Sequence, residues 1–207
     1  MGIQVEHLLD TIHQTDISLF FLINHARSPF LDKLMVRVSD FGIFAPFIAA
    51  LIAYRLFKGT NRERVMWVVG IVAIISSDAL CARILKPLVG RLRPYEALDG
   101  VYLFKHSKWI ITDPQFRKTI AGTLSWPSCH ATNCWAVTFY LLGTKRRFGL
   151  LFAPIALLVS YSRIYLGVHY PLDCLGGILV GAIWGGVFVF VYRAILSNLR
   201  KRYPDFF

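Results

Sequence analysis

The chain has 207 residues, of which 56% are hydrophobic and 17% are charged, and its formal net charge is +11. Soluble domains are about 45–50% apolar and seldom gather that content into long runs, whereas this chain does, so it is not an ordinary soluble domain. Its basic residues lie in short clusters between the apolar runs, which argues against a nucleic-acid-binding protein.

The first 40 residues are less apolar than the rest of the chain. Residues 17–23 are apolar, but polar and charged residues then come in quick succession, and over residues 17–38 the two kinds alternate at helical spacing. This is typical of an amphipathic helix in the membrane interface. We expect residues 1–40 to form an interfacial segment broken near Pro29, with a sixth, weakly apolar span as the alternative. No removable signal peptide is indicated.

Beyond residue 40 there are four long apolar runs, and each approaches the roughly 17–25 residues that a helix needs to cross a bilayer. They are residues 41–57, 65–85, 149–166 and 173–192. A fifth segment, residues 128–143, is more polar and as a helix spans only about 24 Å, so its first turn would begin below the membrane surface. The prediction is one all-α membrane domain over residues 1–207, a bundle of five to six transmembrane helices with an N-terminal amphipathic helix.

Basic clusters in the short connections orient this bundle. With five spans, the clusters within residues 55–64, 145–147 and 193–202 fall on the same side. The positive-inside tendency marks that side as cytoplasmic. Although Lys and Arg are nearly equal in number on the two sides, most acidic residues and the long loops lie on the other side, where charge bias matters less. The opposite helix ends are therefore expected to face outward.

The run over residues 65–85 ends in a dense cationic stretch: Arg83, Lys86, Arg91 and Arg93. Lys86 and Arg93 are each followed by a proline, so we expect the chain to leave the membrane there as a constrained turn. By itself this patch could equally be basic side chains that reach lipid headgroups. It opens a long outer loop, residues 86–127. The basic and aromatic part of this loop either lies over a site and shapes headgroup selection or only connects two spans.

The segment Pro127-Ser128-Cys129-His130 has the pattern of a helix start. Ser128 is a good N-cap residue, and the free amides of Cys129 and His130 would point outward at the positive end of the helix dipole. Such a terminus is a ready anion site. An ordinary N-cap beside an interfacial histidine is the alternative.

A third polar group lies at the end of the run over residues 149–166 and just beyond it: Ser162, Arg163, His169 and Asp173. We expect Gly167 to end one helix and Pro171 to begin the next. His169 and Asp173 are four residues apart across that start, so a carboxylate can bond one ring nitrogen and leave the other free as a nucleophile. Arg163 suits bidentate phosphate binding. Ionisable groups at membrane depth cost roughly 2.5–3.5 kcal/mol each and are functional by default.

Two features inside the spans remain ambiguous. The four cysteines, Cys81, Cys129, Cys134 and Cys174, show no CxxC spacing and no disulfide framework, so we expect small apolar fillers. Cys129 is set apart only by its place in the Pro-Ser-Cys-His segment. Asp78 either lies behind the cationic stretch and supports its basic side chains, or it pairs with a serine or backbone donor on a neighbouring helix.

Taken together, the three motifs resemble those of the type 2 phosphatidic acid phosphatase superfamily, in its small bacterial membrane branch. The family pattern is Lys-x6-Arg-Pro, then Pro-Ser-Gly-His, then Ser-Arg-x5-His-x3-Asp, and the resemblance covers roughly residues 40–195. The matching positions are Lys86, Arg93, Pro94, Pro127, Ser128, His130, Ser162, Arg163, His169 and Asp173. The departure is Cys129, which stands where the family has glycine; a backbone donor is still available there.

The resemblance implies a role for each matched residue. It implies that His169 attacks phosphorus and forms a phosphohistidine, that Asp173 supports it, and that His130 protonates the leaving oxygen and then helps activate water. Phosphate binding would fall to five residues and their amides: Lys86, Arg93, Ser128, Cys129 and Arg163. The family pattern requires neither a metal ion nor a cofactor.

The expected activity is therefore metal-independent hydrolysis of a phosphate or pyrophosphate group from a membrane lipid. Family substrates are phosphatidylglycerol phosphate, undecaprenyl pyrophosphate, lipid A phosphate and phosphatidic acid, and the expected place is the outer face of the bacterial inner membrane. The expected partners are the lipid phosphate and the bilayer, with no nucleic acid, and the sequence leaves the oligomeric state open. The alternative is a lipid or anion transporter that binds such groups without hydrolysis. A soluble vanadate-dependent haloperoxidase is excluded by the apolar runs.

Overall fold

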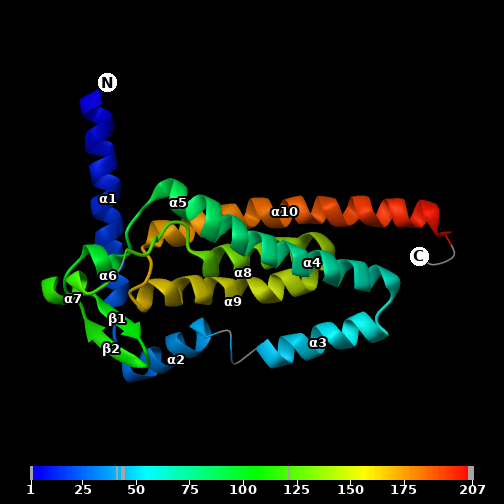
Figure 1. Cartoon of the computed structure of the whole chain (residues 1–207), viewed down its shortest axis with the longest axis horizontal. Coiled ribbons are helices and arrows are strands. Elements are labelled where there is room, and N and C mark those ends of the chain that lie inside the picture. The colour runs from blue at the N-terminus through cyan, green and yellow to red at the C-terminus, as the bar shows by residue number, and fades with distance from the viewer. Residues whose placement is uncertain (1, 41, 43–44, 121, 205–207) are drawn as a thin grey trace.

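The computed structural model describes residues 2–40, 42, 45–120 and 122–204. Most of this chain is helical (Figure 1). Position 41, where the first predicted apolar run begins, lies outside the described residues. The helices that flank the bundle or form it are α1 (Gly2–Asn24), α2 (Pro29–Ser39), α3 (Ala45–Lys58), α4 (Asn61–Ala79), α8 (Cys129–Thr144), α9 (Arg146–Tyr165) and α10 (Pro171–Arg202). Shorter elements come after α4: the π-helical η2 (Leu80–Leu85), α5 (Lys86–Val89), α6 (Pro94–Ala97), β1 (Tyr102–Lys105), β2 (Lys108–Ile111) and α7 (Pro114–Lys118).

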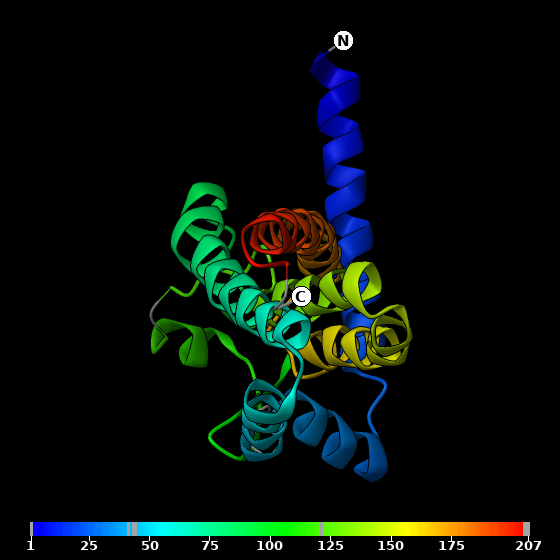
Figure 2. The same cartoon turned by 90° about the vertical axis from the view of Figure 1, so that its right-hand side faces the viewer.

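Four helices, α4, α8, α9 and α10, run side by side and form the bundle (Figures 1 and 2). The central helix is α8, which contacts α4, α9 and α10. Large apolar side chains on the outer side of α10, such as Leu179, Ile183 and Phe190, are exposed. Because a bilayer solvates such a surface and water does not, the bundle is built for lipid.

The packing of α10 against α8 depends on glycines spaced four apart. A Cβ atom added at Gly177 would lie 2.8 Å from Ser128 O, one at Gly181 would lie 2.5 Å from Thr132 O, and one at Gly185 would lie 2.5 Å from Ala136 O. Small residues at this spacing let two membrane helices approach closely. The approach is visible at the helix starts, where Ser128 N donates to Asp173 O at 3.0 Å.

Within the part of the chain that the structure describes, three helices are long and apolar enough to cross a membrane. They are Asn61–Val89, Arg146–Tyr165 and Pro171–Arg202, with 29, 20 and 32 residues. The other two expected spans are shorter as helices, 14 residues for α3 and 16 for α8. By length and composition, three of the expected spans are thus clear within the described residues, and the count of five to six stays a prediction.

One predicted boundary was wrong. The helix expected to end before Lys86 runs on through η2 and α5 to Val89 and ends at Gly90, which has the left-handed φ of 67°. A proline interrupts a helix less where the usual backbone bonding is already altered, and here Pro87 is the second residue after the π-helical turn, which ends at Leu85. Lys86 therefore lies on a helix rather than in a turn.

The N-terminal helix α1 runs nearly perpendicular to the bundle at one end of it, as both views show (Figures 1 and 2). Only its last turns are docked, through three buried residues spaced four apart: Asp16, Phe20 and Asn24. The chain then leaves the α-helix and resumes as α2 at Pro29, where the break was expected. Whether this segment lies in the membrane interface stays a prediction.

The outer loop departs from the all-α expectation by a small antiparallel hairpin, in which Tyr102 pairs with Ile111 and Lys105 with Lys108. The two turn residues, His106 and Ser107, both have positive φ, 49° and 61°. That geometry matches the twist of two-residue hairpin loops, although neither residue is the glycine that usually marks them. The hairpin packs on the end of α9, where Phe104 N donates to Leu166 O at 3.2 Å.

Candidate active site

The three sequence motifs meet at one end of the bundle. The end of α5, the start of α8, the end of α9 and the start of α10 all lie there, beside α1 and the hairpin (Figure 1). Backbone bonds connect them: Ser125 N donates to Arg91 O at 2.7 Å, and Ser128 N donates to Asp173 O at 3.0 Å. Segments far apart in the sequence thus form one buried polar cluster.

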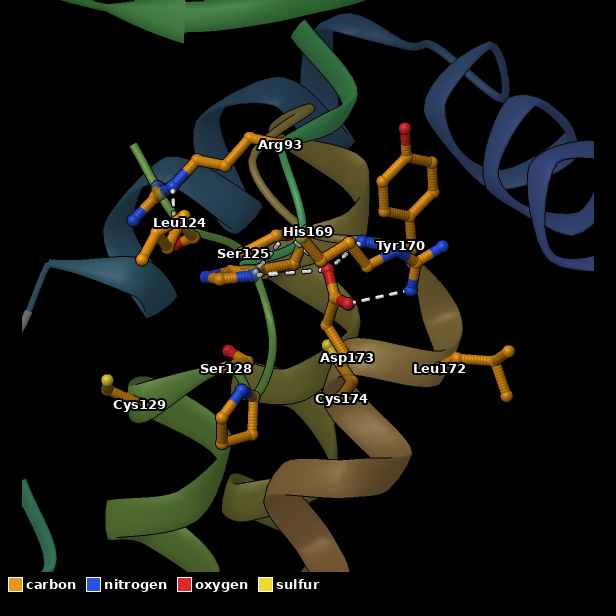
Figure 3. A network of polar contacts seen from close by, with 12 residues as sticks. Arg93, Leu124, Ser125, Ser128, Cys129, His169, Tyr170, Leu172, Asp173 and Cys174 are labelled. Atoms are coloured by element: carbon orange, nitrogen blue, oxygen red, sulfur yellow. Dashed lines mark hydrogen bonds and ion pairs between the residues drawn. The ribbon is translucent and has the colours of Figure 1, made fainter. Parts of the chain in front are cut away.

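His169 and Asp173 form the centre of this cluster (Figure 3). Their side chains are 2% and 0% exposed, and His169 Nδ1 lies 3.5 Å from Asp173 Oδ2. The hydroxyl of Ser125 donates to the same carboxylate oxygen and lies 3.3 Å from Nδ1. The amide of Tyr170 also donates to Asp173 Oδ2, at 2.8 Å. The carboxylate is therefore held in place by several donors, and it faces one nitrogen of the imidazole.

The other ring nitrogen of His169, Nε2, points away from the carboxylate (Figure 3). Burial lowers the pKa of His169 from its ordinary value to about 3, against the opposing pull of Asp173. The imidazole is therefore neutral at pH 7. With Nδ1 turned toward Asp173, the lone pair of a neutral ring is available at Nε2, as a nucleophile requires.

Two of the expected phosphate-binding cations converge on one carbonyl. Lys86 Nζ donates to Leu124 O at 2.6 Å, and Arg93 Nε donates to the same atom at 3.4 Å. The third cation, Arg163, donates from Nη1 to Ser39 Oγ, while its Nε is buried without a hydrogen-bond partner. Arg93 and Arg163 both act electrostatically on His169. The structure therefore brings Arg93 and Arg163 near the imidazole, and Lys86 is linked to Arg93 through the carbonyl of Leu124.

The start of α8 supplies the remaining expected residues. Ser128 is the N-cap residue, but its side chain makes no capping hydrogen bond, and its fully buried hydroxyl has no hydrogen-bond partner. A buried hydroxyl without a partner costs free energy, so this donor is available for an anion. His130 is the second residue of α8. It interacts electrostatically with four site residues: Lys86, Arg93, Arg163 and His169.

The prediction for two of the cysteines was wrong. Cys81 of η2 and Cys129 at the start of α8 form a disulfide, whereas Cys134 and Cys174 are free and buried. The pair is 48 residues apart, and no short spacing reveals it. Cys81 lies in the π-helical turn, which departs from the 3.6-residue period, so sequence periodicity does not specify which way its side chain faces. The side chain of Cys129 points away from Asp173, so only its backbone amide is offered to the site (Figure 3).

Three residues of the cluster were not predicted: Asp16, Arg91 and Ser125. Arg91 binds Asp173 Oδ1 from Nη1 at 2.8 Å and Asp16 Oδ2 from Nη2 at 2.6 Å. Arg91 was visible in the sequence as part of the cationic stretch, where nothing separated it from its neighbours. Asp16 and Ser125 lie outside the motifs, and no local pattern indicated them.

Asp78 lies outside the central cluster. It accepts from Asn133 Nδ2 at 2.9 Å, and Ser77 donates to the oxygen of the same amide at 2.9 Å. This pairing links α4 to α8, in agreement with the second interpretation of Asp78. Asp78 also acts electrostatically on Lys86, so the carboxylate borders the cationic side of the site.

The profile of the PAP2 superfamily matches residues 64–196. The chain belongs to this superfamily, which confirms the resemblance of the three motifs. A lipid A 4'-phosphatase of Bacteroides thetaiotaomicron is 30% identical over 205 residues, covering 95% of this chain and 85% of that protein. Undecaprenyl-diphosphatase BcrC of Bacillus subtilis is 28% identical over 192 residues, covering 84% of this chain and 89% of that protein.

Two solved structures share the fold. Aquifex aeolicus LpxE has a TM-score of 0.55 and 28% identity, covering 84% of this chain and 93% of that chain. A transmembrane PAP2-type phosphatidylglycerolphosphate phosphatase from Bacillus subtilis has a TM-score of 0.61 at 21% identity, covering 91% of this chain and 88% of that chain. Together with its long apolar helices, these likenesses make the chain an integral membrane protein of predominantly helical fold.

Proposed function

We propose that this chain is a metal-independent phosphatase that removes a phosphate or pyrophosphate group from a membrane lipid through a phosphohistidine on His169. Its membership of the PAP2 superfamily makes it a lipid phosphatase. The observation that carries the proposed mechanism is the arrangement around His169. One ring nitrogen faces the buried Asp173, and the other points away from it, while Arg93 and Arg163 both act electrostatically on the ring.

In the first step, Nε2 of His169 attacks phosphorus. The bond from phosphorus to the lipid oxygen breaks as the bond from nitrogen to phosphorus forms. His130 gives a proton to the departing oxygen, because the anionic phosphate bound among Lys86, Arg93 and Arg163 offsets the cations that otherwise disfavour a charged imidazole there. The imidazole ring becomes positively charged, and the Asp173 carboxylate at Nδ1 stabilises that charge. The lipid leaves with a hydroxyl group, or with one phosphate fewer when the substrate is a pyrophosphate.

In the second step, water attacks the phosphohistidine. His130, now neutral, takes a proton from the water, the bond from nitrogen to phosphorus breaks, and inorganic phosphate leaves. The enzyme returns to its starting protonation state. This chemistry uses two imidazoles and one carboxylate, all of which lie in the cluster.

The cations and the start of α8 stabilise the charge of the transition state. Lys86 and Arg93 now share the carbonyl of Leu124, and a phosphate oxygen would replace it as their acceptor. The unpartnered Ser128 hydroxyl and Arg163 Nε supply two more donors. Donors fixed in a water-poor site stabilise developing charge without reorganising, which is the main source of such catalysis.

We further propose that the site lies at the outer face of the inner membrane of a bacterium, in a bundle of five to six spans. The basic connections at the far end of the bundle support this orientation. The Cys81–Cys129 disulfide at the site end supports it independently, because disulfides persist in oxidising compartments. Residues 1–207 then form one membrane domain, with residues 1–40 in the interface and residues 86–127 as the outer loop over the site.

The substrate belongs to the lipid phosphates named for relatives of this chain. Those relatives are named for lipid A, undecaprenyl diphosphate and phosphatidylglycerophosphate. All of them present a terminal phosphate at the membrane surface, which is the chemical group that the cluster of cations recognises.

The decisive experiment uses the purified chain in detergent micelles with a chelator. Phosphate release is measured on phosphatidic acid, phosphatidylglycerol phosphate, undecaprenyl pyrophosphate and lipid A. Release in the chelator, lost in His169→Ala and blocked by vanadate, is the expected result. Binding of these lipids without phosphate release would instead favour the transporter, which needs the cations but has no use for a nucleophile.

A further inference from the structure

A chain of alternating charges extends behind His169. It runs from the imidazole to Asp173, then to Arg91, and ends at Asp16 on the N-terminal helix α1. Arg91 joins the two carboxylates, with distances of 2.8 Å to Asp173 and 2.6 Å to Asp16. Asp16 lies outside residues 64–196, the part of the chain that the family profile matches. It therefore lies N-terminal to the segment that carries the family profile.

The carboxylate of Asp16 is fully used. One oxygen pairs with Arg91, and the other accepts from Leu172 N at 2.9 Å, in the first turn of α10. That turn also carries Asp173. The Asp16 side chain is 1% exposed, and a carboxylate this deeply buried is strongly unfavourable unless it is paired. Asp16 is thus held at one defined place relative to Asp173.

The guanidinium of Arg91 is also held in place by an aromatic ring that packs against its flat face. Its guanidinium carbon lies 3.9 Å from the centre of the Tyr170 ring, and Tyr170 packs against Phe20 of α1 at 5.5 Å. The guanidinium therefore has little freedom to turn away from Asp173. The last turns of α1 contribute to this through both Phe20 and Asp16.

The charge of Arg91 creates a difficulty that Asp16 resolves. When Nε2 bonds to phosphorus, the imidazole turns positive in a region that already contains Lys86, Arg93 and Arg163. Arg91, on the far side of Asp173, would weaken the support that this carboxylate gives to the ring. The reason is that two positive charges, the guanidinium and the phosphorylated imidazole, would share one negative charge. With Asp16 in place, the positive charge of Arg91 is compensated, so Arg91 orients Asp173 without cancelling its charge.

We propose that Asp16 is a positioning residue of the phosphotransfer step, which acts through Arg91 to set the orientation and effective charge of Asp173. This inference rests on the proposed phosphohistidine mechanism. It assigns the docked end of α1 a part in catalysis that is separate from any role in the membrane interface.

Asp16→Asn removes the negative charge that faces Arg91 but keeps an acceptor for Leu172 N, because the amide oxygen of asparagine can accept the same hydrogen bond. We expect kcat to fall about 10- to 100-fold, by analogy with the carboxylates that orient metal-ligating histidines, with KM changed less than about threefold. The KM is spared because Asp16 does not reach the phosphate. Asp16→Glu, which restores the charge, should recover part of the loss. The substrate is whichever of the four lipids the wild-type protein hydrolyses fastest.

A double-mutant cycle tests the route through Arg91. In an Arg91→Met background, Asp16→Asn should lower kcat by no more than about threefold, because its partner is already gone. A full loss in both backgrounds would mean that Asp16 acts independently of Arg91 and would overturn the proposal.

Two matched controls exclude a general effect of losing an acid near the N-terminus. Asp10→Asn changes an exposed residue of α1, and Asp32→Asn breaks a different ion pair, with Arg27 at 2.6 Å. Both should keep kcat, whatever they do to thermal stability. An equal loss of kcat in Asp32→Asn, or a wild-type kcat in Asp16→Asn, would overturn the inference. If His169→Ala still hydrolysed the lipid, the proposed function itself would fail instead.

Discussion

The two ends of the bundle carry similar charged groups but bury them to different degrees. At the site end, Asp16 and Asp173 are 1% and 0% exposed and share Arg91. At the far end, Glu63 is 19% exposed and pairs with Lys145 at 3.1 Å. Exposed ion pairs contribute little, whereas breaking a buried pair leaves an uncompensated charge. The same substitution should therefore act strongly at one end and weakly at the other.

The largest effect is expected at the proposed nucleophile. His169→Ala should lower kcat by about 10⁴-fold or more, because the variant lacks the nucleophile that accepts the phosphoryl group. Phosphate release from the lipid panel is the measurement. His13→Ala, on the exposed part of α1, serves as the control and should keep wild-type activity. A His169→Ala variant that kept a tenth of the activity would place the nucleophile elsewhere.

A smaller loss is expected at the start of α8. Ser128→Ala should lower kcat by about 10²-fold, in line with the removal of one donor to a developing oxyanion. Its thermal stability should stay close to wild type, because the hydroxyl has no hydrogen-bond partner in the protein. Activity and melting temperature are measured together, with Ser18→Ala as the control. A stability loss without an activity loss would make Ser128 a structural residue.

The disulfide is expected to affect stability more than chemistry. Reduction, or the double variant Cys81→Ala with Cys129→Gly, should lower the free energy of unfolding by about 2–4 kcal/mol. Activity should fall only a few-fold, because the backbone amide of residue 129 remains. Thermal unfolding with and without reductant measures the effect, and reductant should leave the double variant unchanged. Two free thiols at these positions in the protein from cells would refute the pairing.

The smallest effect is expected at the far end of the bundle. Glu63→Gln should cost less than about 1 kcal/mol of stability and leave kcat unchanged, since its ion pairs are partly exposed. Asp16→Asn, the same kind of change at the site end, is the matched comparison. Equal effects of Glu63→Gln and Asp16→Asn on kcat would contradict the expectation that the more deeply buried carboxylate matters more.

Sequence patterns could predict which helix ends carry the site because its residues sit beside strong local signals. Gly167 ends one helix and Pro171 begins the next, and this places His169 and Asp173 within reach of each other. The same patterns predicted the cationic groups and the helix start at Ser128, but not the absence of a capping hydrogen bond there. These features depend on neighbours in the sequence, where helix-end chemistry is readable.

The rest depends on contacts between distant segments. Asp16 reaches Arg91 because α1 lies across the end of the bundle, and Cys81 of the π-helical turn pairs with Cys129 at the start of α8. Neither the crossing of two helices nor their relative rotation appears in a periodic pattern. The hairpin was missed for a local reason, since His106 and Ser107 adopt positive φ without a glycine.

The most direct test of the nucleophile is to trap the covalent intermediate. The purified chain is mixed with a phosphate-labelled lipid, quenched within milliseconds in alkali, and digested for mass spectrometry. Phosphohistidine is stable in alkali and labile in acid, so the expected result is one acid-labile phosphate on His169, absent from His169→Ala. Phosphate on another residue, or complete turnover with no labelled enzyme at any quench time, would contradict nucleophilic attack by His169.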